Sequence, residues 1–451
     1  MANFLIAPAD ETVVQQTISL PSGRRRALWA GALAWSPKGV LALLDQGLIS
    51  GANFIVGILL ARHLTPHQYG AYGLAFQIFL LLSVGYSALI LEPLSVFGPS
   101  IYKTSNREYL GVLLRINGVV ATITILGLAA CAGVLRMIAP SGDLASALIG
   151  VAIASPCMLL FSLARRGFYI KLSPRQAAMG ASVYFAVVLS GLLIAYYLGS
   201  LSPLVAFLLI ASGAAVTAPL MLSRLGFSLN HQPAVLRTSE VIHRHWRYGR
   251  WALGSAIAIW LSSAVYYPIL GSFHGLAETG AVQALSNFSS PIGQAFAAMS
   301  MLSLPYAAGI HHQKRSKNTD HLATRLALIY AGGTTLYWIL IVLFRAQIVE
   351  HLYAGKYVGI VELIPWLAVG SILRISATSQ AIILRAMHAP YLVFIAYGAG
   401  SAADILVGIP CTCVFGLSGA IFGMVLSSAV ALVVTLVMLY RRPPSSSSLA
   451  N

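Results

Sequence analysis

Charged side chains are scarce in this chain. Asp, Glu, Lys and Arg make up 9 % of its 451 residues, whereas a soluble globular domain carries about 25 %. Acidic side chains are the scarcest, because 12 Asp and Glu stand against 28 Lys and Arg, which gives a formal net charge of +16. The length alone would allow roughly three soluble domains. The apolar fraction of 58 % excludes that arrangement and favours a membrane protein.

Cysteine pairs, metal-ligand clusters and catalytic signatures are also lacking. Four cysteines occur, each within or at the end of an apolar stretch, at positions 131, 157, 411 and 413. They form neither a disulfide framework nor a metal-binding pattern. The pair His243 and His245 and the pair at 311–312 each lack a third ligand, so we expect solvated loop residues. No Walker A, HExxH or GxSxG sequence occurs. We therefore expect no enzyme, no catalytic residue, no metal and no cofactor.

The chain contains instead twelve long apolar spans. We place them near residues 39–61, 70–91, 110–131, 144–164, 177–198, 203–222, 248–273, 280–309, 322–344, 361–384, 390–414 and 418–440. Each span is long enough to cross about 30 Å of hydrocarbon as a helix. The pattern predicts an all-α polytopic membrane protein with twelve transmembrane helices.

Positive charge in the gaps between spans alternates along the chain. One set of alternate gaps, which includes both tails, holds 22 of the 28 Lys and Arg, and the other set holds 4. Short cytoplasmic loops are rich in Lys and Arg, so this asymmetry predicts that both termini are cytoplasmic. Topology explains most of the basic residues, and we expect no nucleic-acid partner. A cationic inner face would also attract anionic lipid head groups.

The longest gap divides the spans into two groups of six. The predicted parts are a cytoplasmic tail (1–38), an N-lobe (39–222), a cytoplasmic linker (223–247), a C-lobe (248–440) and a cytoplasmic tail (441–451). Because six is even, the lobes share an orientation and any symmetry axis runs along the membrane normal. A weak internal match at an offset of 210 residues pairs Gly70 with Gly280. Each glycine follows the turn between the first two spans of its lobe.

Ionisable residues inside the spans are the candidate functional residues, because a lone charge there is costly. Asp45 and Arg115 lie at similar depths in spans 1 and 3, and Glu92 closes span 2 at the same side. We expect one network of these three residues in the N-lobe. In the C-lobe, Arg374 and Asp404 lie at heights that differ by about one helical turn, so they can pair. In both lobes, a static salt bridge is the alternative to a functional role.

Uncharged polar residues also lie within the spans. They are Gln46, Asn53, Gln77, Asn117, Gln283, Asn287, Gln294 and Gln380. Such residues either line a wet cavity or bridge neighbouring helices by hydrogen bonds. The sequence leaves both interpretations open.

The first hundred residues resemble a known family. The similarity rests on ALLDQGLISGANFIVGILLARHLTPHQYGAYGLA (42–75) and LEPLSVFGP (91–99), with weaker support from RRGFY (165–169) and GLSGAIFG (416–423). These stretches resemble Wzx-type polysaccharide or O-antigen flippases of the multidrug/oligosaccharidyl-lipid/polysaccharide (MOP) superfamily. The turn reads LTP where that family usually has LGP. The resemblance implies two six-helix lobes around a central cavity in the bacterial inner membrane.

The implied activity is alternating-access transfer of an undecaprenyl-diphosphate-linked oligosaccharide to the outer leaflet. Expected partners are this substrate, membrane lipids, and polysaccharide polymerase and export machinery. Arg115 and Arg374 would then bind the diphosphate, because guanidinium groups bind phosphate oxygens bidentately. Asp404 or Asp45 would couple transport to H⁺ or Na⁺. The alternatives are a cation-coupled multidrug exporter of the same superfamily and a non-transporting scaffold in polysaccharide synthesis.

Overall fold

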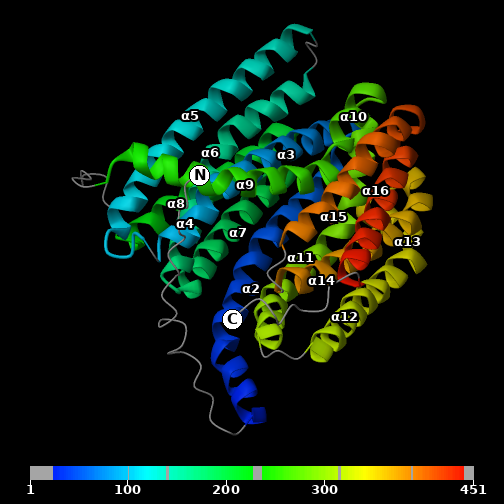
Figure 1. The fold of residues 1–451 in the computed structure, drawn as a ribbon. Coiled ribbons are helices and arrows are strands. Elements are labelled where there is room, and N and C mark those ends of the chain that lie inside the picture. Colours follow the sequence, from blue (N-terminus) through cyan, green and yellow to red (C-terminus); the bar gives the residue numbers. More distant parts are fainter. Residues whose placement is uncertain are drawn as a thin grey trace, which may run out of the picture.

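The chain forms a bundle of helices (Figure 1). It is known from a computed structural model that describes residues 24–99, 101–138, 142–226, 236–312, 316–386 and 390–440. Within these ranges every regular element is a helix and none is a strand. The predicted all-α fold class is therefore confirmed.

The first half of the chain, up to Arg224, contains eight helical elements. They are α2 (Arg24–His63), α3 (Pro66–Tyr86), η1 (Ser87–Leu91), α4 (Glu92–Phe97), α5 (Asn106–Ile138), α6 (Asp143–Ile170), α7 (Pro174–Tyr197) and α8 (Pro203–Arg224). Local sequence explains several starts. Thr65 and Gln68 form a reciprocal capping box at α3, and Ser202 caps α8. Proline occupies the first position of α3, α7 and α8, where its missing N–H costs nothing.

The second half, from Thr238 onward, contains ten described elements. They are α9 (Thr238–Ala264), α10 (Tyr266–Phe273), α11 (Leu276–His312), α12 (Ser316–Leu343), α13 (Arg345–Tyr353), η2 (Val358–Leu363), α14 (Ile364–Ala386), α15 (Pro390–Ala403) with η3 (Asp404–Gly408), and α16 (Ile409–Tyr440). Both η1 and η3 are π-helical turns. Such turns are rare and occur frequently at functional sites.

Each of the twelve predicted spans lies on helical residues. By length and composition alone, nine stretches of the described residues can cross a membrane. The last of them, Tyr391–Tyr440, is 50 residues long and covers two predicted spans. Gly416 has φ 57° inside α16 and separates those two spans, because this backbone conformation favours glycine and interrupts the helix.

Helices of the same half pack mainly on one another. In the first half α6 packs on α5 and α8, and α2 packs on α7; in the second half α16 packs on α14 and α15, and α12 packs on α14. Figure 1 shows α5–α8 on one side of the bundle and α12–α16 on the other. The predicted bounds of the two lobes remain a prediction.

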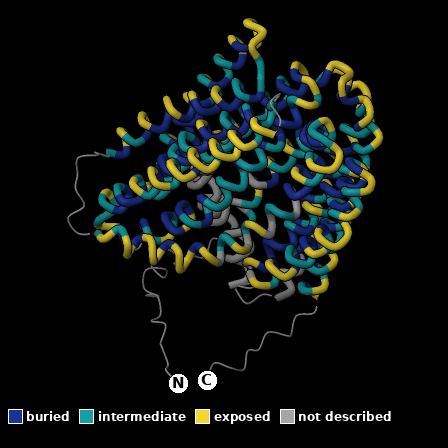
Figure 2. Tube along the Cα trace, turned by 90° about the horizontal axis from the view of Figure 1, so that it is seen from above, coloured by how far each residue is buried: buried dark blue, intermediate teal, exposed yellow. Residues whose placement is uncertain are grey.

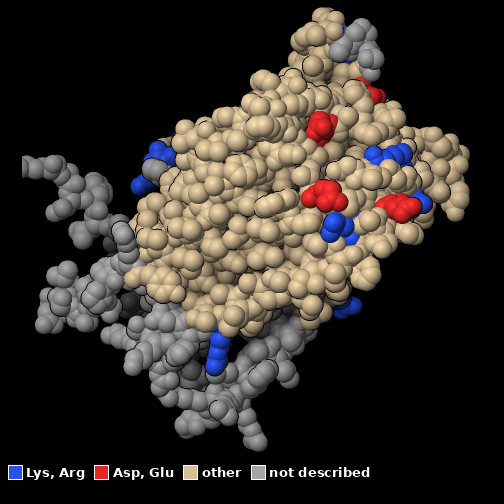
Figure 3. Space-filling model, turned by 90° about the vertical axis from the view of Figure 1, so that its right-hand side faces the viewer, with Lys and Arg blue, Asp and Glu red and all other residues tan. Residues whose placement is uncertain are grey.

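The surface of the bundle is apolar, as a lipid environment requires. Large apolar side chains such as Ile123, Leu336 and Phe422 are exposed, and Figure 2 shows exposed residues around the outside of a buried interior. Most of the face drawn in Figure 3 carries no charged side chain. Following the topology predicted from the sequence, we call the end where α2 meets α3 and α10 meets α11 the outer end. The opposite end, where η1 and α4 lead into α5, is the inner end.

Candidate functional site

Asp45 binds an arginine on a neighbouring helix. Its carboxylate is fully buried and accepts hydrogen bonds from Arg165 Nε at 3.1 Å and Arg165 Nη2 at 2.5 Å. The Tyr169 hydroxyl donates a third bond, at 2.6 Å. The ring of Phe161 lies 5.6 Å from the Arg165 guanidinium carbon. This bidentate, buried geometry is the strongest form of an arginine–carboxylate pair, and it ties α2 to α6.

The predicted network of Asp45, Arg115 and Glu92 is therefore wrong, because Asp45 pairs with Arg165 and not with Arg115. The predicted span 4 ends at residue 164, just before Arg165, whereas α6 continues to Ile170. The extra helical turn brings Arg165 and Tyr169 to the depth of Asp45. Both belong to the RRGFY stretch, which was the available signal. Arg115 and Glu92 have exposed side chains, and neither lies within 4 Å of an opposite charge among the described residues.

Asp404 lies in a cradle formed by three elements of the second half. Its carboxylate is fully buried and accepts hydrogen bonds from Tyr266 Oη at 2.5 Å and Ser427 Oγ at 2.8 Å. Two glycines make room for the phenol: a Cβ on Gly408 would lie 2.4 Å from Tyr266 Oη, and a Cβ on Gly423 would lie 2.3 Å from it. The cradle thus offers carboxylate and hydroxyl oxygens at one place, at the start of the π-helical turn η3.

The predicted pair between Arg374 and Asp404 is not formed. The ion pairs among the described residues do not include it, and the Arg374 side chain is exposed on α14. Its backbone carbonyl accepts a hydrogen bond from Thr378 Oγ1 at 2.9 Å, and Thr378 also bonds the Tyr397 hydroxyl of α15. Equal height in neighbouring spans was insufficient, because Asp404 is buried against α10 and α16, whereas Arg374 is exposed.

Several of the uncharged polar residues bridge helices. Gln46 Nε2 of α2 donates to Gln294 Oε1 of α11 at 3.4 Å. Asn287 Nδ2 of α11 donates to the Tyr69 hydroxyl at 2.9 Å. Within the first half, the Tyr86 hydroxyl donates to Asn117 Oδ1 at 2.9 Å. Gln46 and Asn287 thus connect the two halves, and Asn117 connects two helices of the first half.

At the outer end, the halves touch backbone to backbone. A Cβ on Gly70 would lie 1.6 Å from the carbonyl oxygen of Leu276 and 2.9 Å from Gly280 N. A Cβ on Gly280 would lie 2.4 Å from the carbonyl oxygen of Pro66 and 3.1 Å from Gly70 N. The two glycines that the internal sequence match paired therefore meet in space. No side chain fits between α3 and α11 at this crossing.

Two cations reinforce the outer contact. Arg62 Nη1, at the end of α2, donates to the carbonyl oxygen of His351 in α13 at 2.6 Å. Lys356 Nζ, just beyond α13, donates to the carbonyl oxygen of Leu64 at 2.8 Å. Each cation thus binds a carbonyl at the C-terminal end of the other's helix, where backbone acceptors are unsatisfied and the helix dipole favours positive charge. Burial lowers the pKa of Lys356. We call this pair the reciprocal caps.

At the inner end, a buried histidine joins the halves. His245 Nδ1 of α9 donates to the carbonyl oxygen of Leu89 at 2.9 Å, so its Nε2 accepts from the Tyr109 hydroxyl at 2.6 Å. Gly249 lets α9 approach η1, since a Cβ there would lie 2.7 Å from the carbonyl oxygen of Ala88. Burial lowers the pKa of His245, and its bond to Leu89 opposes that shift.

This buried position corrects the expectation of solvated loop histidines. His243 is exposed as expected but lies on α9 and not in a loop, and the expectation is wrong for His245, which is 3 % exposed. The reason is that α9 begins at Thr238, inside the predicted linker, and carries His245 onto η1. The side chains at 311–312 lie outside the described residues.

The architecture has known counterparts. The chain is similar to a multidrug resistance MATE family transporter of the MOP superfamily in its inward-facing conformation (TM-score 0.72, 15 % identity, 89 % of this chain and 97 % of that chain). It is also similar to the lipid II flippase MurJ in an inward closed conformation (TM-score 0.68, 13 % identity, 91 % and 87 %). The fold is that of MOP-superfamily transporters.

A third structure of similar fold belongs to the same superfamily. It is a MOP superfamily transporter from Pyrococcus furiosus (TM-score 0.64, 13 % identity, 89 % of this chain and 93 % of that chain). No family profile and no curated protein matches the sequence. At these identities the likeness shows the fold alone.

Proposed function

We propose that this protein is a flippase of the bacterial inner membrane. It moves an oligosaccharide linked to undecaprenyl diphosphate from the inner to the outer leaflet by alternating access, and it is not an enzyme. The observation that supports this most is the closed outer end, where α3 and α11 touch at Gly70 and Gly280. In alternating access, one repeat moves against the other around a site between them. A transporter whose outer end is closed is in the conformation that receives substrate from the inner leaflet.

The substrate class follows from the fold and from the arginines. A MOP fold serves the lipid II flippase MurJ, so it can accommodate a lipid-linked substrate. Arg115 and Arg374 are exposed and form no ion pair within 4 Å among the described residues. Their guanidinium groups are thus free of carboxylate neutralisation there and can bind diphosphate oxygens bidentately.

Asp404 is the better candidate for coupling to H⁺ or Na⁺. Asp45 is held by two nitrogens of Arg165, Nε and Nη2, and this pairing already neutralises its charge. The Asp404 cradle adds the hydroxyl oxygens of Tyr266 and Ser427 to a carboxylate, and hard cations prefer oxygen ligands. Ion binding shifts conformation only by its differential affinity for the two states. The three elements that form the cradle would have to separate or close with the transport cycle.

A cation-coupled multidrug exporter is the second candidate, favoured by the likeness to MATE transporters at a TM-score of 0.72. A scaffold role predicts that neutralising Arg115 and Arg374 leaves polymer export intact. The phenotype of a gene deletion distinguishes the flippase from the exporter. A flippase predicts that lipid-linked oligosaccharide accumulates in the inner leaflet, with unchanged drug susceptibility. Drug hypersensitivity without such accumulation would replace the flippase by the exporter. The polymerase, the export machinery and the cytoplasmic termini remain predictions.

A further inference from the structure

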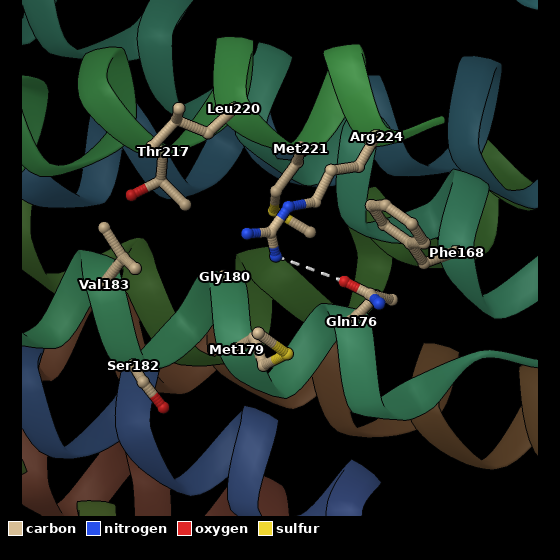
Figure 4. Close-up of a pocket in the computed structure, with 10 residues that line it drawn as sticks. All are labelled: Phe168, Gln176, Met179, Gly180, Ser182, Val183, Thr217, Leu220, Met221 and Arg224. Atoms are coloured by element: carbon tan, nitrogen blue, oxygen red, sulfur yellow. Dashed lines mark hydrogen bonds between the residues drawn. The ribbon is translucent and has the colours of Figure 1, made fainter. Parts of the chain in front are cut away.

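A groove of about 270 Å³ opens between α7 and α8 near the inner end of the first half (Figure 4). Ten residues line it: Phe168, Gln176, Met179, Gly180, Ser182, Val183, Thr217, Leu220, Met221 and Arg224. Gly180 brings the two helices together beneath the groove, since a Cβ there would lie 2.4 Å from Met221 Sδ. Both helices pack mainly on other helices of the first half. The groove therefore lies apart from the contact between the two halves.

The walls of the groove are apolar and open to the surroundings. Met179 and Val183 on α7 and Leu220 on α8 are exposed. The two wall hydroxyls are already used within their own helices: Ser182 Oγ donates to the carbonyl oxygen of Ala178, and Thr217 Oγ1 donates to that of Gly213. The walls thus offer an occupant apolar contact and little hydrogen bonding. A polar solute would lose its hydration there without compensation.

Cations gather at one end of this apolar groove. Arg224 ends α8 and lies at the groove, where its Nη1 donates to Gln176 Oε1 at 3.3 Å. A guanidinium carries five N–H donors, so one long hydrogen bond leaves most of its capacity for an anion. Arg175 is exposed one turn before Met179, on the same face of α7. Lys171 lies beside them, with Nζ bonded to the carbonyl oxygen of Leu225 at 3.0 Å.

We propose that this groove binds an anionic phospholipid of the adjoining leaflet. One acyl chain lies between α7 and α8, and the phosphate binds Arg224, with Arg175 beside it. The occupant must be apolar along the walls and anionic at one end, and a bilayer supplies such a molecule at that depth. The position agrees with the charge distribution of the sequence, which predicts that this end lies at the cytoplasmic leaflet, where anionic lipids attract basic residues.

Native mass spectrometry of protein from nanodiscs with equal phosphatidylglycerol and phosphatidylethanolamine tests the site. We expect the wild type to retain phosphatidylglycerol preferentially. The double variant Arg224→Gln with Arg175→Gln should lower that retention by at least about tenfold, from the loss of charge-assisted hydrogen bonds. Arg237→Gln removes an exposed arginine at the same end, outside the groove, and should change nothing.

A second variant tests the groove itself and keeps every charge. Val183→Phe with Leu220→Phe fills the walls and should lower phosphatidylglycerol retention about as much. If the filled variant retains the lipid as the wild type does, the binding is ordinary surface attraction and the proposal is wrong. Equal retention of both lipids by the wild type, or an equal loss in Arg237→Gln, would also overturn it. Unfolding temperature and elution volume report whether each variant folds. If the variant with both arginines replaced does not fold, the single variant Arg224→Gln is measured in its place.

Discussion

Arg62 and Lys356 bind each other's helix ends across the boundary between the two halves. The distances are 2.6 Å to the carbonyl oxygen of His351 and 2.8 Å to that of Leu64. In the predicted topology both cations lie on the outer side, which has only 4 Lys and Arg in its gaps. Half of these few outer cations therefore serve one contact, and the contact joins the halves.

Removing the reciprocal caps should open the outer end. A hydrogen bond to a charged group contributes about 1.5–3 kcal/mol, so Arg62→Ala with Lys356→Ala should shift the equilibrium toward the outward-open state by at least about tenfold. Spin labels at His67 and Phe273, both exposed near the outer end, would report the shift as a longer distance. Arg136→Ala serves as the control, because this exposed cation is on α5. An unchanged distance distribution in the double variant would show that the caps do not hold the halves.

The glycine crossing should tolerate no methyl group. A Cβ on Gly70 would lie 1.6 Å from a backbone oxygen, and backbone cannot move aside as a flexible side chain can. Gly70→Ala should therefore prevent closure and abolish transport while the protein still folds. Gly118→Ala, on the open surface of α5 with nothing within 4 Å, should be neutral or slightly stabilising. Normal transport by Gly70→Ala would mean that the halves need not meet at this crossing.

The Asp45–Arg165 pair should be structural. Replacing one partner leaves a buried charge without its counter-ion, which costs about 3–5 kcal/mol. Arg165→Gln should lower the unfolding temperature more than Arg166→Gln, its neighbour and matched control. Asp45→Asn combined with Arg165→Gln should recover part of the loss. If Asp45→Asn alone leaves stability unchanged but stops transport, Asp45 is a coupling residue and the structural assignment is wrong.

His245 should make the inner contact sensitive to acid. Because burial lowers its pKa, the unfolded state binds the proton more readily than the folded state. Stability is therefore complete above about pH 6.5, the unfolded value, and declines as the pH falls below it. A pH series of unfolding temperatures should show this slope in the wild type and lose it in His245→Gln. His243→Gln, the exposed neighbour, should keep it. The same slope in both variants would exclude His245 as its source.

The all-α membrane fold followed from composition and from the apolar spans, because hydrophobic length is a local property. The internal match aligned Gly70 with Gly280, but it did not predict that the two glycines meet. Side-chain partners were less accessible. One extra turn of α6 decided the partner of Asp45, and an early start of α9 buried His245. The predicted spans are bounded where charged residues begin, whereas both helices continue past those residues.

The central claim is most directly tested by reconstitution. Proteoliposomes that carry a lipid-linked oligosaccharide are exposed to a lectin that cannot cross the bilayer, and the rate at which inner-leaflet glycan becomes accessible is measured. The account predicts faster transfer than in protein-free liposomes, and a loss of at least about tenfold in Arg374→Gln. Arg385→Gln, an exposed arginine farther along α14, should transfer at the wild-type rate. Transfer no faster than in protein-free liposomes, with export of a cationic drug instead, would contradict the flippase function.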